Sequence, residues 1–199
     1  MLMLHAGAEQ TGSTLVKGPR TRAAIIGAAS EAFTVGGYES TTLDQIAAKV
    51  DITRGTVLFH FATKRALLLA VVDPLFQDMD TLLSEFERYP VPLTPRRRRA
   101  LLTRYCDTLI EHRFATILLV RDLTTIVQMH WPTAEGPEVT FRMMALLQGH
   151  HPDRALKLRA AATIGAILRP VCMPPIHPDT FDAEARQVIV ESALAAYRS

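Results

Sequence analysis

Residues able to bind a polyanion lie together in the first third of the chain. Arg54, Gly55 and Thr56 are consecutive, and His60 and Lys64 follow at intervals of four. Guanidinium, hydroxyl, imidazole and ammonium groups donate hydrogen bonds to phosphate oxygens and base edges, and a glycine leaves room for a duplex to approach closely. This set of residue types predicts contact with DNA.

Two short helices joined by a sharp turn are predicted to position these groups. The first covers Leu43–Lys49, where Thr42 can cap the helix and Gln45 completes a capping box. The second begins after Thr53, a good N-cap residue, and ends near His60. The few residues between them allow only a sharp turn. The pair is therefore predicted to be a helix-turn-helix, whose second helix has the size to enter a major groove.

Two longer helices flank this motif. One is predicted from Pro19 to about Val35, where a pair of glycines ends it. The other opens after its cap, Thr63, and its apolar face stays in phase beyond Pro74, which predicts one kinked helix rather than two.

The excess of positive over negative charge lies in the same region. The net charge of the 199 residues is only +2. Between residues 17 and 65, however, seven basic residues outnumber four acidic ones, a net charge of +3, whereas the remainder holds 15 basic and 16 acidic residues, a net charge of −1. A positive excess confined to this segment is expected if the segment faces phosphates.

Composition predicts a soluble, all-α globular protein. Hydrophobic residues make up 48% and charged residues 21% of the chain, and strand-like alternation never extends beyond a few residues. No apolar run approaches the roughly 18 to 20 residues of a membrane span. The N-terminus also lacks the basic and apolar regions of a signal peptide. Cys106 and Cys172 have no partner spacing, which predicts free thiols in a reducing cytoplasm.

About nine helices are expected in all, in two domains. A flexible tail over residues 1–18 precedes a helix-turn-helix domain over 19–64, and a larger helical domain covers 65–199. Within the larger domain, helices are predicted over residues 94–113, 114–131, 138–150, 152–169 and 180–197, with Pro132–Pro137 as a turn and Pro170 ending the helix before it.

The first domain resembles the DNA-binding domain of the TetR family of transcriptional regulators. About 45 residues carry the resemblance, in the family's order: Thr21-Arg22, Ile26, Ala29, Phe33, Gly37-Tyr38, Thr41-Thr42, Ile46-Ala47, Ile52 to Thr56, His60, Phe61 and Lys64. The resemblance implies a DNA-binding regulator rather than an enzyme, followed by a ligand-binding and dimerisation domain. The DNA contacts it implies are Thr41, Thr42, Thr53, Arg54, Gly55, Thr56, Phe59, His60 and Lys64.

Two residues depart from the family pattern. Asp51 stands in the turn where glycine is usual, at a position that needs a positive φ, which Asp tolerates better than most residues. Leu58 stands where the family usually has a tyrosine that contacts phosphate, so this contact loses its hydroxyl donor. The segments IIGAA, GYESTTL and HFATK also resemble the γ-butyrolactone autoregulator receptors, a branch of the family from which Leu58 departs.

The resemblance further implies a homodimeric repressor that a small, largely apolar ligand releases from a near-palindromic operator. The last two helices would form the dimer, through small and apolar residues such as Ala160, Gly165, Val188 and Ala193. Two recognition helices would then lie about 34–36 Å apart. The candidate ligand-binding residues are Phe86, Cys106, Ile110, Phe114, Leu118, Ile126, Met129, His130, Trp131, Met143, Met144 and Leu147.

Several alternatives remain open from the residues alone. The ligand candidates are also typical of plain helical core. Cys106 or Cys172 would allow a redox-responsive regulator, and an α-helical enzyme is a further alternative, although no hydrolase, phosphate-loop or dinucleotide fingerprint occurs. We expect no cofactor and no metal, since the adjacent His150 and His151 lie on different helical faces. The run Arg96–Arg99 is predicted to be a solvated face.

Overall fold

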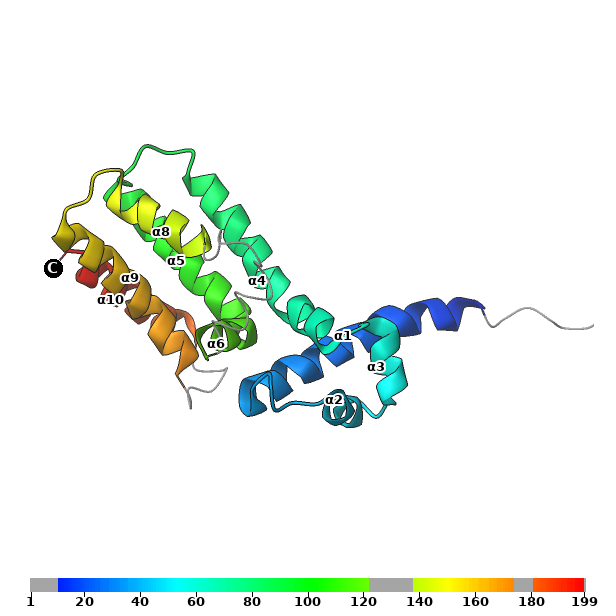
Figure 1. The fold of residues 1–199 in the computed structure, drawn as a ribbon. Helices are drawn as coiled ribbons and strands as arrows, with labels where there is room; N and C mark the ends of the chain where they lie inside the picture. The colour runs from blue at the N-terminus through cyan, green and yellow to red at the C-terminus, as the bar shows by residue number, and fades with distance from the viewer. Residues whose placement is uncertain (1–10, 122–137, 174–180, 199) are drawn as a thin grey trace, which may run out of the picture. The chain divides into compact units, whose positions relative to one another are not determined.

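The computed structural model describes residues 11–121, 138–173 and 181–198, with side chains from residue 18 onward. Within these ranges it contains nine α-helices and no strand (Figure 1), which confirms the predicted all-α class. The chain divides into two compact units, Met1–Val71 and Val72–Ser199.

The first unit comprises α1 (Thr11–Gly36), α2 (Leu43–Lys49), α3 (Arg54–His60) and the start of α4 (Lys64–Phe86). Its centre is apolar: Ile25, Phe33, Ile46, Val57, Phe61 and Leu67 are all buried. The ring of Phe33 meets that of Tyr38 edge-on, with 5.4 Å between centroids. The bounds of α2 and α3 agree with the predicted ones.

The first helix is longer than predicted. It begins at Thr11 rather than Pro19, so residues 11–18, predicted as part of a flexible tail, are helical. Pro19 lies inside α1, where its ring nitrogen has no N–H to donate to the helix. Residues 1–10 lie outside the described part of the chain.

The second unit comprises the rest of α4 and the helices that follow, namely α5 (Pro95–Glu111), α6 (Arg113–Arg121), α8 (Glu138–Gln148), α9 (Arg154–Cys172) and α10 (Ala183–Arg198). The helix α9 packs against α5, α6, α8 and α10, and α10 also packs against α5 (Figure 1). Leu82, Leu101, Leu118, Leu147 and Ile167 are among the residues that fill this core. As predicted, α4 continues through Pro74 as one helix.

Helix ends in the second unit correct three predictions. Pro170 does not end α9, which continues to Cys172 and closes its last turn with a bond from the Met173 amide to the Arg169 carbonyl (3.1 Å). Asp153 and Asp182 accept bonds from the amides of Leu156 (2.7 Å) and Ala185 (2.8 Å), so α9 and α10 begin a little later than predicted. The predicted segment from 122 to the turn ending at Pro137 lies outside the described residues.

The arginine run at the start of α5 is only in part the predicted solvated face: Arg96 and Arg99 are exposed, whereas Arg97 and Arg98 are half-buried. The guanidinium carbon of Arg97 lies 3.9 Å from the centre of the Tyr89 ring, and that of Arg98 lies 3.6 Å from the Tyr197 ring. Arg99 forms a two-pronged ion pair with Glu191 of α10, and these hydrogen bonds lower the pKa of the Glu191 carboxyl. Three of the four arginines are therefore engaged within the chain.

No single helix in the described ranges is long and apolar enough to cross a membrane. Only α3 and α4 taken together, bent by 56° at their junction, reach the length and hydropathy of such a span.

Candidate nucleic-acid interface

The caps of α2 and α3 hold the helix-turn-helix as predicted. The Thr42 hydroxyl accepts a bond from the Gln45 amide at 3.2 Å, and the Gln45 side-chain oxygen accepts one from the Thr42 amide at 2.8 Å. The Thr53 hydroxyl accepts a bond from the Thr56 amide at 3.1 Å and thereby caps α3. Each cap satisfies backbone donors that the first helical turn leaves without a partner.

The turn between the helices depends on Asp51. Its φ is 52°, and among the described residues it is the one non-glycine with a positive φ. The chain then returns through a bond from the Ile52 amide to the Ala47 carbonyl (3.1 Å). The prediction that Asp51 adopts the left-handed conformation usual for glycine is confirmed.

The outer surface of α3 is small and largely apolar. Val57 is fully buried, whereas Phe59 is 84% exposed and Leu58 is 38% exposed. Arg54 and Gly55 are also exposed, and a Cβ added at Gly55 would meet only the Thr53 hydroxyl, at 3.6 Å. The backbone at Gly55 is therefore open to a close approach.

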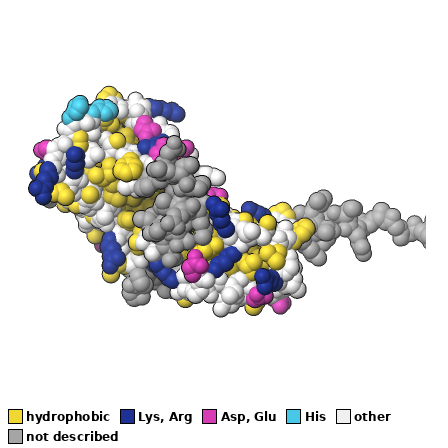
Figure 2. Space-filling model, in the orientation of Figure 1, with side chains coloured by type: hydrophobic (Ala, Val, Ile, Leu, Met, Phe, Trp, Pro, Cys, Tyr) yellow, Lys and Arg dark blue, Asp and Glu magenta, His cyan; other side chains and the backbone are white. Residues whose placement is uncertain are grey.

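The basic residues around α3 already have partners inside the first unit. Arg54 lies 3.5 Å from Asp44, and Lys49 lies 3.0 Å from Glu31. On the face in view in Figure 2, Lys and Arg side chains are scattered, several beside Asp or Glu, rather than gathered in one patch. Exposed ion pairs of this kind contribute about 0–1 kcal/mol, so a phosphate can displace the carboxylate at little cost.

One predicted contact residue, Thr41, faces inward. The Thr41 side chain is buried, and its hydroxyl donates to the Gly37 carbonyl (2.7 Å) and lies 3.1 Å from the Ala32 carbonyl. Its hydroxyl fastens α1 to the start of α2 and is closed to a phosphate. Lys64 is half-buried and donates to the Glu39 carbonyl oxygen at 3.0 Å. His60, at the end of α3, is also half-buried, with its ring edge-on to Phe59 at 5.3 Å.

Most of the predicted ligand-binding residues that the structure describes lie in the core of the second unit. Phe86, Cys106, Leu118, Met143 and Leu147 are buried core, Ile110 and Met144 are half-buried, and Phe114 is 47% exposed. Ile126, Met129, His130 and Trp131 lie outside the described residues. Helical spacing identifies the buried face of a helix, but it does not distinguish close-packed core from pocket lining.

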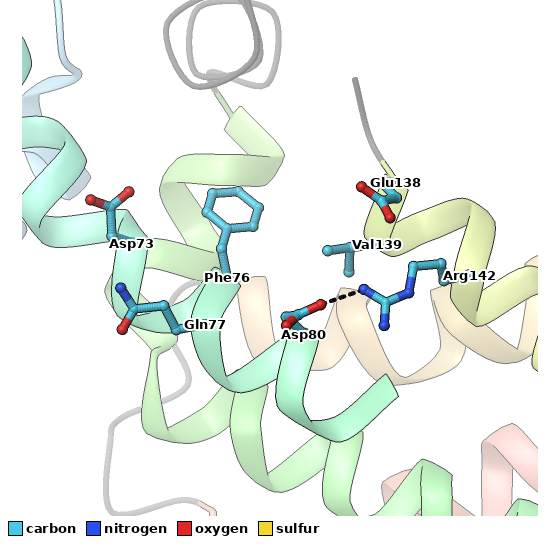
Figure 3. Close-up of a pocket in the computed structure, with 7 residues that line it drawn as sticks. All are labelled: Asp73, Phe76, Gln77, Asp80, Glu138, Val139 and Arg142. Carbon is cyan, nitrogen blue, oxygen red and sulfur yellow. Dashed lines mark hydrogen bonds and ion pairs between the residues drawn. The ribbon is translucent and has the colours of Figure 1, made fainter. Parts of the chain in front are cut away.

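A cavity of about 420 Å³ lies between α4 and α8 (Figure 3). Its lining mixes charged and apolar side chains: Asp73, Phe76, Gln77, Asp80, Glu138, Val139 and Arg142. Arg142 reaches across to Asp80 at 2.6 Å and to Glu87 at 2.7 Å. The hydrogen bond to Glu87 and, to a smaller extent, the one to Asp80 raise the pKa of the Arg142 guanidinium above its usual value. This lining is more polar than the predicted one.

The two cysteines do not favour redox sensing. Both are free thiols and both are buried. Burial raises the pKa of Cys106 and of Cys172 to about 11, so neither forms the reactive thiolate at neutral pH. His150 and His151 are exposed, and the described residues bring together no group of three side chains suited to a metal.

Comparison with known proteins points to one family. The family described as "Bacterial regulatory proteins, tetR family" matches residues 25–71. The transcriptional regulator TcmR of Streptomyces glaucescens is 30% identical over 192 residues, which cover 90% of this chain and 83% of TcmR. The A-factor receptor protein of Streptomyces griseus is 34% identical over 74 residues, 37% of this chain and 25% of that protein.

Other similarities cover either a short segment or most of the chain. Two regulators of Pseudomonas putida share 46% identity over 59 residues, and the match spans only 28% and 44% of their lengths. The whole fold is similar to the crystal structure of the regulator PfmR from Thermus thermophilus, with a TM-score of 0.65 and 14% identity, over 88% of this chain and 97% of that one. The two matches of high identity are therefore confined to 59 residues, whereas the similarity in fold covers most of the chain.

Proposed function

The chain belongs to the TetR family of bacterial regulatory proteins, and from this premise we propose that it is a homodimeric, DNA-binding transcriptional regulator of the cytoplasm. The proposal rests on which side chains of α3 are buried and which are exposed. This capped helix buries Val57 in its own unit and leaves Arg54, Gly55 and Phe59 exposed. A short helix held on one face and open on the other is suited to the major groove.

The remaining DNA contacts in this proposal flank α3. They are Thr42, Thr53, Thr56, His60 and Lys64. Thr42, Thr53 and Arg54 are exposed, so phosphates can reach them. Arg54 exchanges its exposed pair with Asp44 for a phosphate or a base edge.

Exposed apolar side chains on the last two helices support the dimer. Leu158, Ala161, Ala162 and Gly165 recur at helical spacing and are all exposed on α9, where Leu158 is 62% exposed. Val188 of α10 is 59% exposed. Two copies that pair these helices bury the stripe and place two α3 helices on one face of DNA. Their operator is then near-palindromic, because a twofold protein reads two equivalent half-sites.

Release from DNA works through α4 in this proposal. The helix begins at Lys64, directly after α3, and continues to Phe86, past the cavity that it shares with α8. A ligand in the cavity shifts α4 and so changes the separation of the two recognition helices, which makes the protein a repressor relieved by its effector. The lining of Phe76, Val139 and Arg142 suits a small molecule with an apolar body and a polar group.

Fluorescence anisotropy with a labelled palindromic fragment from the gene's own upstream region tests the proposal. We expect the logarithm of the affinity to fall linearly with the logarithm of salt concentration between roughly 50 and 200 mM. Arg54→Gln should reduce that slope by about 0.9, the value for one lost phosphate contact. Arg104→Gln is the matched control, because Arg104 is exposed and paired with Glu85 in the other unit. Absence of salt-dependent binding would contradict the proposal.

The effector mechanism has a separate test. Small molecules that protect the protein against thermal unfolding are titrated into the protein–DNA complex, and their site is checked with Val139→Trp, which fills the cavity between α4 and α8. We expect operator affinity to fall as the ligand binds and Val139→Trp to abolish both effects. A ligand that occupies this cavity and leaves operator affinity unchanged contradicts release through α4.

A further inference from the structure

The most exposed large apolar side chain of the first unit lies on α3. Phe59 is 84% exposed and Leu58, beside it, is 38% exposed, although Val57 and Phe61 next to them are buried. The side of α3 that faces the core is therefore already packed, and Phe59 is not a displaced core residue. An exposed phenylalanine offers apolar area that a partner surface can cover.

Polar readout by α3 is limited by its composition. The helix reads RGTVLFH and contains neither an amide nor a carboxylate side chain, the groups that pair with adenine and cytosine. The Thr53 and Thr56 hydroxyls lie 3.0 Å apart and hydrogen-bond to each other. Gly55 contributes no side chain, so Arg54 and the apolar pair dominate the exposed surface.

The apolar feature of a major groove is the C5 methyl group of thymine. We propose that Phe59, with Leu58 beside it, is a specificity-determining residue that selects thymine in each half-site by covering this methyl group. The inference rests on the proposed DNA-binding function. His60 lies beside Phe59, and its ring is edge-on to that of Phe59 with 5.3 Å between centroids and an interplanar angle of 83°, so the two rings form one aromatic surface at the end of α3.

Replacement of thymine by deoxyuridine isolates the methyl group. It removes the methyl and keeps every hydrogen-bonding group and the charge of the duplex. A palindromic duplex is selected by the wild-type protein from a random pool, and single deoxyuridines are then placed at each thymine of both half-sites. Binding of the full-length protein is measured by fluorescence anisotropy at fixed salt.

We expect at least one thymine per half-site at which deoxyuridine weakens wild-type binding. The affinity should fall about four-fold there, which is the change expected when one methyl group is no longer buried. Phe59→Ala should bind the thymine and deoxyuridine duplexes equally, and Leu58→Ala should reduce the difference. Phe141→Ala is the control, because Phe141 is 68% exposed on α8 of the other unit, and it should keep the full difference.

Two results would overturn the inference while the proposed function stands: salt-dependent binding with no sensitivity to deoxyuridine at any position, or a Phe59→Ala variant that still discriminates. Circular dichroism with an unchanged melting curve shows that Phe59→Ala is folded, as expected for so exposed a side chain. Failure of the wild-type protein to select any duplex overturns the proposed function itself, and this inference with it.

Discussion

The ammonium group of Lys64 lies 4.4 Å from the centre of the Tyr38 ring. The same group donates to the carbonyl oxygen of Glu39 at 3.0 Å. Together these contacts tie the first residue of α4 to the segment between α1 and α2. Tyr38 is itself buried, and this burial, followed by the charge of Glu39, raises the pKa of its hydroxyl.

This pairing predicts a measurable coupling. Lys64→Met and Tyr38→Leu should each lower the free energy of unfolding, and the double variant should lose less than the sum of the two. We expect a coupling of about 0.5–1 kcal/mol, the range for a partly exposed cation–π contact. Urea unfolding of the four proteins measures it. Additive losses would mean that the ring does not stabilise the ammonium group.

A tyrosine at position 58 should tighten operator binding. Leu58 is partly exposed on α3 and has no donor for a phosphate. Leu58→Tyr adds a hydroxyl, and one hydrogen bond contributes about 1 kcal/mol, or roughly five-fold in affinity. Leu58→Phe is the control, since it adds the ring without the hydroxyl. Equal affinities of the two variants would show that the hydroxyl finds no phosphate.

Alkaline conditions should weaken the fold through its buried thiols. The pKa of Cys106 and of Cys172 is raised to about 11 in the folded protein from an ordinary value of 9.0. The stabilising contribution is therefore complete below pH 9 and is lost as the pH rises towards 11, because the unfolded chain releases these protons first. We expect a loss of roughly 4–5 kcal/mol between pH 8 and pH 11, with about 2 kcal/mol from each thiol.

Urea unfolding at these two pH values measures the loss, and Cys106→Ala with Cys172→Ala should make it smaller. Tyr105, also buried with a raised pKa, accounts for a residual dependence on pH that the double variant keeps. A pH dependence that does not change in the double variant would contradict the assignment to the thiols.

Local signals predicted the helix-turn-helix well, because its helix bounds depend on nearby residues. Thr42 with Gln45, and Thr53 with Thr56, define the starts of α2 and α3 within three positions of sequence. Asp51 was predictable for the same reason, since one residue fixes the conformation of the turn. Such signals need no knowledge of the rest of the fold.

Tertiary contacts explain what the sequence alone did not predict. Arg98 packs over the ring of Tyr197, which lies at the other end of the chain. No local sequence pattern therefore indicates that residues of the arginine run make contacts within the protein. Packing against α5, α6, α8 and α10 supports α9 through Pro170, at the cost of one hydrogen bond. Burial of Phe86 or Leu147 is readable from helical periodicity, but the position of a cavity depends on how side chains from several helices fit together.

Gly165 offers a direct test of the proposed dimer. It is exposed on α9, and a Cβ added there meets nothing within 4 Å inside the chain. Gly165→Leu should therefore leave the monomer folded while its side chain holds the α9 helices of two copies apart. Gly27→Leu is a matched control, since Gly27 is also an exposed helical glycine with open space around it, in the first unit. Light scattering after size exclusion should give a dimer for the wild-type protein and for Gly27→Leu, and a monomer for Gly165→Leu.

Binding to a palindromic duplex should weaken more than ten-fold in the monomeric variant, because each copy then holds a single half-site without the gain from linking two. A Gly165→Leu protein that remains dimeric places the interface on another surface.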